Sequence, residues 1–169
     1  MVLISPETPA DESAVESIHA AAFPTDDEAE LVAALRQTDA FVPSLSLVAR
    51  DDDNAVVGHV LCTRVVVEDD PSIRALTLAP VGVHPDEQGQ GIGSSLVQTA
   101  LDTAVEDGFD LVFLHGDPDF YSRFGFHPAG IRGFENPFET PPEVFMVATV
   151  GDDSDEGGPL SYPDPFDDI

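Results

Sequence analysis

The chain has 169 residues, with 33 acidic side chains against six arginines, no lysine and a formal net charge of −27. This balance excludes the basic patch that nucleic-acid binding requires, and no apolar run is long enough to span a membrane. A hydrophobic content of 42% at this length predicts one globular domain with a sizeable core.

The charge indicates the medium in which the protein works. At about 1 M salt the Debye length falls to about 3 Å, which screens the self-repulsion of an acidic surface. The composition is similar to that of proteins from salt-accumulating halophiles. No charged-then-apolar leader follows Met1, so we expect a soluble cytoplasmic protein. Cys62 has no partner for an internal disulfide, and its apolar context predicts a small buried side chain.

The first half of the chain is predicted to form two helices and four strands. Thr8-Pro9-Ala10-Asp11 has the hydroxyl, proline and acidic residue of a helix start, and we expect His19 at the edge of that helix's apolar packing. A second helix is predicted from Asp27 to Gln37. The predicted strands are Met1 to Ser5, Leu45 to Arg50, Ala55 to Val67 and Arg74 to Val83.

The second half begins with the clearest helix pattern, Ser94 to Asp107, followed by Gly108 at the expected C-cap. Phe109 to Leu114 is an uninterrupted apolar run, typical of a buried parallel strand. The remaining expected elements are two helical turns over 117–124, a strand beginning at 125–128, an ordered loop over 129–143 and a closing strand from Val144 to Val150.

This order of elements, two antiparallel hairpins before a strand-loop-helix crossover, predicts an α+β fold with a mixed sheet. We place one domain at residues 1–150 and an acidic C-terminal tail at 151–169. The tail is expected to be either disordered or draped on the surface, with Leu160, Tyr162 and Phe166 as its anchors.

A glycine loop lies between the strand ending at Val83 and the helix beginning at Ser94. Gly89, Gly91 and Gly93 would let an anion approach the main chain, and the helix dipole favours negative charge there. A P-loop is excluded because the chain has no lysine, and the G-x-G-x-G spacing is not the dinucleotide fingerprint. Gln88, Gly91 and Gly93 instead form Gln-x-x-Gly-x-Gly, which resembles the acetyl-coenzyme A (acetyl-CoA) pyrophosphate loop of the GNAT superfamily of N-acetyltransferases.

A second motif supports this resemblance. Phe120-Tyr121-Ser122-Arg123-Phe124-Gly125-Phe126 resembles the Phe-Tyr-x-x-x-Gly-Phe signature of the same superfamily, one strand downstream of the loop. Upstream, 57–61 and 77–83 are similar to an uncharacterised bacterial and archaeal branch, and the composition makes the chain haloarchaeal-like. The resemblance covers roughly residues 3 to 150 and implies a GNAT-like acyl-CoA N-acyltransferase fold, a mostly antiparallel mixed sheet flanked by helices.

The resemblance implies acetyl-CoA as cosubstrate, a primary amine as acceptor and no metal. Tyr121 matches the tyrosine that protonates the leaving thiolate. The strand exit would supply oxyanion-stabilising amides and pair with the pantetheine arm, the loop would hold the pyrophosphate, and Arg123 would lie near the phosphates. The cofactor-binding residues implied are Val81, Gly82, Val83, Gln88, Gly89, Gln90, Gly91, Ile92, Gly93, Ser94 and Arg123.

The general base stays open, because Ala75 to Val83 contains no carboxylate. His84, Glu87, His59, His115 or an ordered water chain would each serve. The acceptor is also open between a small cationic amine and a protein N-terminus or lysine. The alternative function is a non-catalytic acyl-CoA-binding or sensing module, and the edge strands with the 129–143 loop allow a homodimer.

Overall fold

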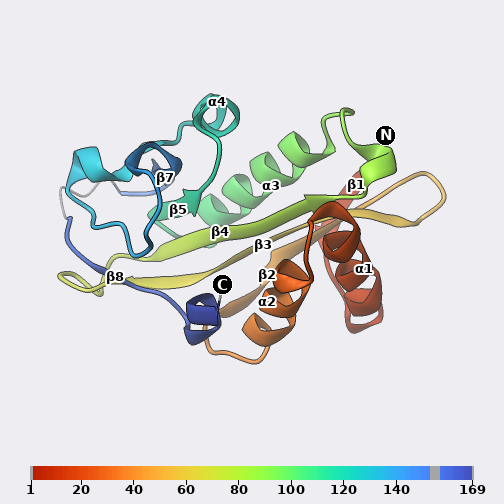
Figure 1. The fold of residues 1–169 in the computed structure, drawn as a ribbon, viewed down its shortest axis with the longest axis horizontal. Coiled ribbons are helices and arrows are strands. Elements are labelled where there is room, and N and C mark those ends of the chain that lie inside the picture. The colour runs from red at the N-terminus through yellow and green to blue at the C-terminus, as the bar shows by residue number, and fades with distance from the viewer. Residues whose placement is uncertain (1, 153–156, 169) are drawn as a thin grey trace.

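The computed structural model describes residues 2–152 and 157–168 (Figure 1). The helices are α1 (Glu12–Ala22), α2 (Asp27–Leu35), α3 (Ile92–Glu106) and the single turn α4 (Pro118–Tyr121). The strands are β1 (Leu3–Pro6), β2 (Phe41–Arg50), β3 (Val56–Val67), β4 (Ala75–Val83), β5 (Leu111–His115), β6 (His127–Pro128), β7 (Phe145–Thr149) and β8 (Leu160–Ser161).

The strands form one sheet in the order β1-β2-β3-β4-β5-β7-β6, with β8 pairing with β3 off this path. The pair β4 and β5 is parallel, and the other pairs formed by the described strands are antiparallel. This confirms the predicted α+β fold with a mixed, mostly antiparallel sheet. The parallel pair follows from the crossover through α3, since neighbouring parallel strands need a long connection.

Helices cover both faces of the sheet (Figure 1). The apolar face of α3, with Leu96, Val97 and Ala100 fully buried, packs against β2 to β5. On the opposite face, α1 and α2 bury Val15 and Leu35 among a second cluster that also contains Phe166. The α4 turn lies on the same side of the sheet as α3.

Most predicted boundaries differ from the structure by one or two residues, and two of the differences have a clear local cause. The helix expected from Ser94 begins at Ile92, because Gly91 adopts a left-handed N-cap conformation with φ of +83°. The strand expected from Leu45 begins at Phe41, and a register shift between Phe41 and Ser46 accommodates Pro43 in this stretch.

The C-terminal segment packs onto the domain over residues 157–168. Leu160 and Phe166 are 8% and 3% exposed, β8 pairs with β3, and Tyr162 packs beside Phe166. Of the two alternatives left open by the sequence, the anchored one describes this segment. Residues 153–156 and 169 of the predicted tail lie outside the described residues.

Candidate functional site

The site begins where β4 parts from β5. The two strands pair from Ala75–Leu111 to Thr77–Phe113, but β4 continues to Val83. A bulge marks the point of departure: Cys62 faces Leu78 and Val60 faces Val81, so two residues of β4 lie opposite one of β3. Bulges bend a strand and redirect its groups. The second half of β4 therefore has an edge that β5 leaves unpaired.

The backbone of this half-strand is oriented by its pairing with β3. The His84 amide donates to the Val57 carbonyl at 2.9 Å, and the register continues as Gly82 opposite His59. In an antiparallel pair, every second residue points both its N–H and its C=O group at the partner strand. His84 and Gly82 are such residues, so the amides of Val81 and Val83 point away from β3. The Gln88 side-chain amide, which donates to the Val83 carbonyl at 3.1 Å, occupies part of that edge.

The glycine loop exposes the amino end of α3. Gly89 and Gly91 both have φ of +83°, a conformation that only glycine adopts readily. The first intrahelical bond from this turn runs from the Ser95 amide to the Gly91 carbonyl at 3.0 Å. The amides of Ile92, Gly93 and Ser94 therefore have no partner within the helix, and they meet at its positive dipole end.

A cavity of about 450 Å³ lies over this helix end. The Arg123 guanidinium stacks over the Phe120 ring, 4.9 Å from its centroid, and is the one basic side chain among the lining residues that the structure describes. The cavity is lined by Val81, Val83, Glu87, Gln88, Gly89, Gly91, Ile92, Gly93, Ser94, Phe120 and Arg123.

Two predicted cofactor-binding residues do not line this cavity. Gly82 faces α1, where a β-carbon would lie 2.7 Å from the Nδ1 atom of His19, so helix packing explains why this position is glycine. Gln90 turns its side chain toward Glu87, 3.4 Å from the carboxylate.

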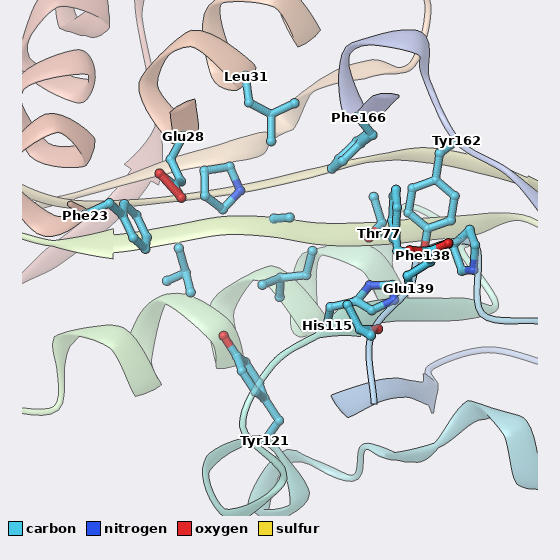
Figure 2. Close-up of a pocket in the computed structure, with 16 residues that line it drawn as sticks. Phe23, Glu28, Leu31, Thr77, His115, Tyr121, Phe138, Glu139, Tyr162 and Phe166 are labelled. Carbon is cyan, nitrogen blue, oxygen red and sulfur yellow. The ribbon is translucent and has the colours of Figure 1, made fainter. Parts of the chain in front are cut away.

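Tyr121 lines a second, larger cavity of about 780 Å³, which shares Val81 with the first. The phenol points from α4 toward β4 (Figure 2) and makes no hydrogen bond to the described residues. Burial, with smaller effects from Cys62 and Asp117, raises the pKa of Tyr121 to about 12. Gly116, which no sequence motif indicated, leaves room for the ring, because a β-carbon at this position would clash with it.

The larger cavity has walls from both faces of the sheet. Tyr121 packs with the cluster beneath α3, whereas Leu31 and Phe166 belong to the cluster beneath α1 and α2. The cavity therefore passes through the sheet where β4 and β5 separate. Figure 2 shows the side chains that line it arranged around β4. They are Phe23, Glu28, Leu31, Thr77, Leu78, Ala79, Pro80, Val81, His115, Tyr121, Pro137, Phe138, Glu139, Thr140, Tyr162 and Phe166.

A buried polar chain runs beside the site. His19 is fully buried rather than at the edge of the helix packing, because its Nε2 atom lies 2.8 Å from Nδ1 of His59. The His59 Nε2 atom lies 2.9 Å from the Ser46 hydroxyl, which donates to Glu7 at 2.6 Å. Since the carboxylate only accepts, Ser46 must accept from His59 and His59 from His19. Burial lowers the pKa of His19 to about 4 and that of His59 well below its usual range.

The four candidates for a base are placed differently. His59 lines neither cavity and is hydrogen-bonded at both ring nitrogens. His84 accepts from the Asp86 amide at 3.1 Å, which caps a short turn. Glu87 lines the smaller cavity, and His115 lines the larger one with its Nε2 bonded to Asn136 at 2.9 Å.

Other chemistries receive no support from the described residues. Cys62 is 1% exposed and burial raises its pKa to about 12, so its thiol is the buried hydrophobe predicted. No group of three or more His, Cys, Asp or Glu side chains in the described ranges could hold a metal ion. Within the same ranges, no helix has the length and apolarity needed to cross a membrane.

Comparisons with known proteins agree with this geometry. A family model described as "Acetyltransferase (GNAT) family" matches residues 13–126. The chain is 34% identical over 167 residues to "Uncharacterized N-acetyltransferase YhbS" of Escherichia coli K12, covering 98% of both chains. It is 37% identical over 137 residues to "Uncharacterized N-acetyltransferase YjhQ" of the same strain, covering 79% of this chain and 74% of YjhQ.

Two solved structures extend the similarity to three dimensions. The Escherichia coli YhbS crystal structure in complex with CoA superposes with a TM-score of 0.91 at 32% identity, covering 98% of this chain and 92% of that one. A GNAT family acetyltransferase from Brucella melitensis in complex with acetyl-CoA gives 0.79 at 29% identity, covering 98% of each chain. The α+β sheet with its parted parallel strands is thus an acetyltransferase architecture. The chain belongs to the GNAT acetyltransferase family and is by class an N-acetyltransferase.

Proposed function

We propose that the protein transfers the acetyl group of acetyl-CoA to a primary amine by direct attack of the amine on the thioester. The observation that carries the proposal is the pair of cavities that meet at Val81, one over the amino end of α3 and one passing through the sheet. The structures of the two relatives with CoA and acetyl-CoA support the choice of donor.

The smaller cavity supplies the donor site in this proposal. The free amides of Ile92, Gly93 and Ser94, with Gln88 and Gly89 to Gly91 forming the loop, bind the pyrophosphate. Arg123, the one basic side chain among the described residues that line this cavity, contributes positive charge near the phosphates. The unpaired edge at Val81 to Val83 bonds the pantetheine arm as an added strand would, and its outward amides stabilise the oxyanion.

Tyr121 is the general acid in this proposal. When the nitrogen of the neutral amine bonds to the acetyl carbon and the carbon–sulfur bond breaks, the phenol gives its proton to the departing thiolate. The nitrogen loses one proton to water, from which the phenol is reprotonated. Burial supports this role, because a pKa raised to about 12 keeps the phenol protonated throughout the physiological range. Its hydroxyl also has no described protein partner that would compete for the proton.

Tyr121→Phe tests this role against Tyr162→Phe, which removes the other phenol that lines the same cavity. General acids contribute about 10²–10⁴ in rate, so we expect Tyr121→Phe to lower kcat at least about 10²-fold while CoA affinity holds. Tyr162→Phe should change kcat less than about threefold, because its hydroxyl has no role in the proposed proton transfer. Release of free thiol over a panel of amines is the assay.

An unchanged rate in Tyr121→Phe would remove this residue from the mechanism. CoA binding without thiol release on any amine would instead favour the non-catalytic acyl-CoA-binding or sensing module. The two outcomes are distinguished by calorimetric titration of CoA into each variant.

We also propose that the acidic surface adapts the protein to a salt-rich cytoplasm. The support is compositional, namely 33 acidic side chains against six basic ones. YhbS and YjhQ are proteins of the bacterium Escherichia coli, so they do not support the haloarchaeal-like branch, and the salt adaptation is inferred from composition. Local amide dipoles rather than lysines suit anion binding in such a medium, where exposed charges are screened.

A further inference from the structure

We propose that Glu28 binds the ammonium group of the acceptor and that this acceptor is an amine with an apolar body and no carboxylate. The inference rests on the proposed function, because it assigns the substrate class of the same site. It concerns recognition of the protonated amine and adds no covalent step, since the ammonium must lose one proton before the attack proposed above.

The first observation is that the carboxylate of Glu28 lines the larger cavity with an unpaired oxygen. It projects from the first turn of α2 into the larger cavity, which Phe23 also lines (Figure 2). Its Oε1 atom is buried and has no hydrogen-bond partner among the described residues. An unpaired carboxylate oxygen away from water is unfavourable, so the free protein leaves unmet an interaction that a cationic donor would provide.

The charges around the cavity select a cation. Besides Glu28, the charged side chain on its lining is Glu139, which is exposed at the surface of the loop before β7. Burial lowers the pKa of His115, which keeps that imidazole neutral at physiological pH. The described lining contains no arginine, and the chain has no lysine. A substrate carboxylate would therefore find no positive partner, which disfavours free amino acids.

The other residues that line the cavity favour an acceptor whose body is apolar. Phe23, Phe138, Tyr162 and Phe166 supply aromatic surface, and Leu31 and Pro80 supply aliphatic surface. A volume of about 780 Å³ is in the range of small-molecule sites. An arylalkylamine meets both conditions, since its ring contacts the apolar walls while its ammonium reaches Glu28.

The position of Glu28 is compatible with the donor site. Leu31, one turn after Glu28 on α2, belongs to the cluster beneath α1 and α2, so Glu28 approaches the cavity from that face of the sheet. Tyr121 packs with the cluster beneath α3, on the opposite face. An amine held at Glu28 would enter from the face opposite to the glycine loop. The two substrates would thus meet within the gap between β4 and β5 without competing for space.

The test uses 2-phenylethylamine, titrated calorimetrically into the full chain with and without saturating CoA in about 2 M KCl, where exposed charges are screened. Phenylalanine is the matched probe, since it adds a carboxylate to the same amine and ring. Glu28→Gln removes the charge at nearly constant volume. Glu30→Gln makes the same exchange two residues away on α2, where the side chain is exposed.

We expect 2-phenylethylamine to bind and Glu28→Gln to weaken that binding about 10- to 100-fold, the value of a charge-assisted hydrogen bond. The affinity of Glu30→Gln for 2-phenylethylamine should stay within about twofold of the wild-type value. Phenylalanine should bind the wild type at least about 10-fold more weakly than 2-phenylethylamine does. Neither exchange removes a side-chain hydrogen bond to a described residue, so both variants should stay folded. Glu30→Gln should unfold at the wild-type temperature, and Glu28→Gln at that temperature or slightly above it, because it removes an unpaired buried charge.

Equal affinities in Glu28→Gln and Glu30→Gln, equal binding of the two probes, or no binding of 2-phenylethylamine would each overturn the inference. Thiol release from acetyl-CoA in any of these cases would leave the proposed function standing. Failure of CoA itself to bind would overturn the proposed function, whatever the amine titration shows.

Discussion

Gly89 and Gly91 show most clearly how a single residue shapes the donor site. Both have φ of +83°, and a β-carbon at either would meet no atom within 4 Å, so the requirement for glycine comes from the backbone alone. Gly93 differs, because it lies within α3 without a positive φ and a β-carbon would touch Val83 at 3.8 Å.

Gly91→Ala should therefore destabilise the protein by about 1–2 kcal/mol, the cost of a left-handed alanine, and weaken CoA binding as the loop shifts. Gly93→Ala should leave stability the same or slightly higher, because φ at this position suits any residue and alanine has less backbone freedom to lose on folding than glycine. Denaturant unfolding in concentrated KCl measures both. Equal losses in the two variants would contradict the role assigned to φ.

The pair of His19 and His59 makes stability depend on pH. Unfolded histidines bind a proton below about pH 6.5, whereas burial keeps His19 neutral to about pH 4 and lowers the pKa of His59 also. Unfolding therefore takes up protons, and the free energy of unfolding should fall as pH drops from 6.5 to 5, by about 1.4 kcal/mol per pH unit for each proton.

His19→Phe should reduce this slope by about one proton, since one of the two imidazoles is gone. Unfolding curves at several pH values between 5 and 6.5 give the slope, a range in which most carboxylates stay ionised. A slope equal to that of the wild type would show that His19 is not a buried neutral group.

Glu28 shows what a sequence does not reveal about a residue. It stands among Asp26, Asp27 and Glu30 at the start of a helix, where acidic residues are favoured by the dipole, and nothing local distinguishes it from its neighbours. Its place in a cavity depends on β4, on the 129–143 loop and on the C-terminal segment, all more than 40 residues away.

At the scale of elements, the parts that carry local signals were predictable. The capping sequence at Thr8, the glycine loop and the apolar stripe of α3 each specify their own conformation, and the structure has them within a few residues of the predicted bounds. The bulge at Ala79 and Pro80 was not predicted, because register is decided by pairing with β3 rather than by the strand itself.

The C-terminal segment contributes both stability and a cavity wall. Phe166 is 3% exposed and packs with α2 residues in the cluster beneath α1 and α2. We expect Phe166→Ala to lower the free energy of unfolding by about 3 kcal/mol, as for other buried aromatic truncations. Asp167→Ala, at an exposed neighbouring position, should change it by less than about 0.5 kcal/mol.

Denaturant midpoints at constant m-value measure this difference. A change of under about 1 kcal/mol in Phe166→Ala would mean that the segment detaches in solution. The donor site should be unaffected in either variant, because Phe166 does not line the smaller cavity.

The charge of the whole molecule governs the conditions for binding a polyanion. A net charge of −27 repels acetyl-CoA in dilute buffer, and the donor cavity offers amides and Arg123 rather than lysines. Salt screens the long-range repulsion more than it weakens close contacts with oriented amides. CoA affinity should therefore hold or improve as KCl rises, the reverse of the behaviour of a lysine-lined anion site.

Titration of acetyl-CoA in molar KCl, run beside a thiol-release assay on a panel of amines, decides whether the glycine loop binds the donor and whether the acetyl group is transferred. We expect saturable binding whose affinity does not fall as KCl is raised, and thiol release with at least one apolar amine. Absence of acetyl-CoA binding at every salt concentration would contradict the assignment of the glycine loop, and with it the proposed acetyl transfer.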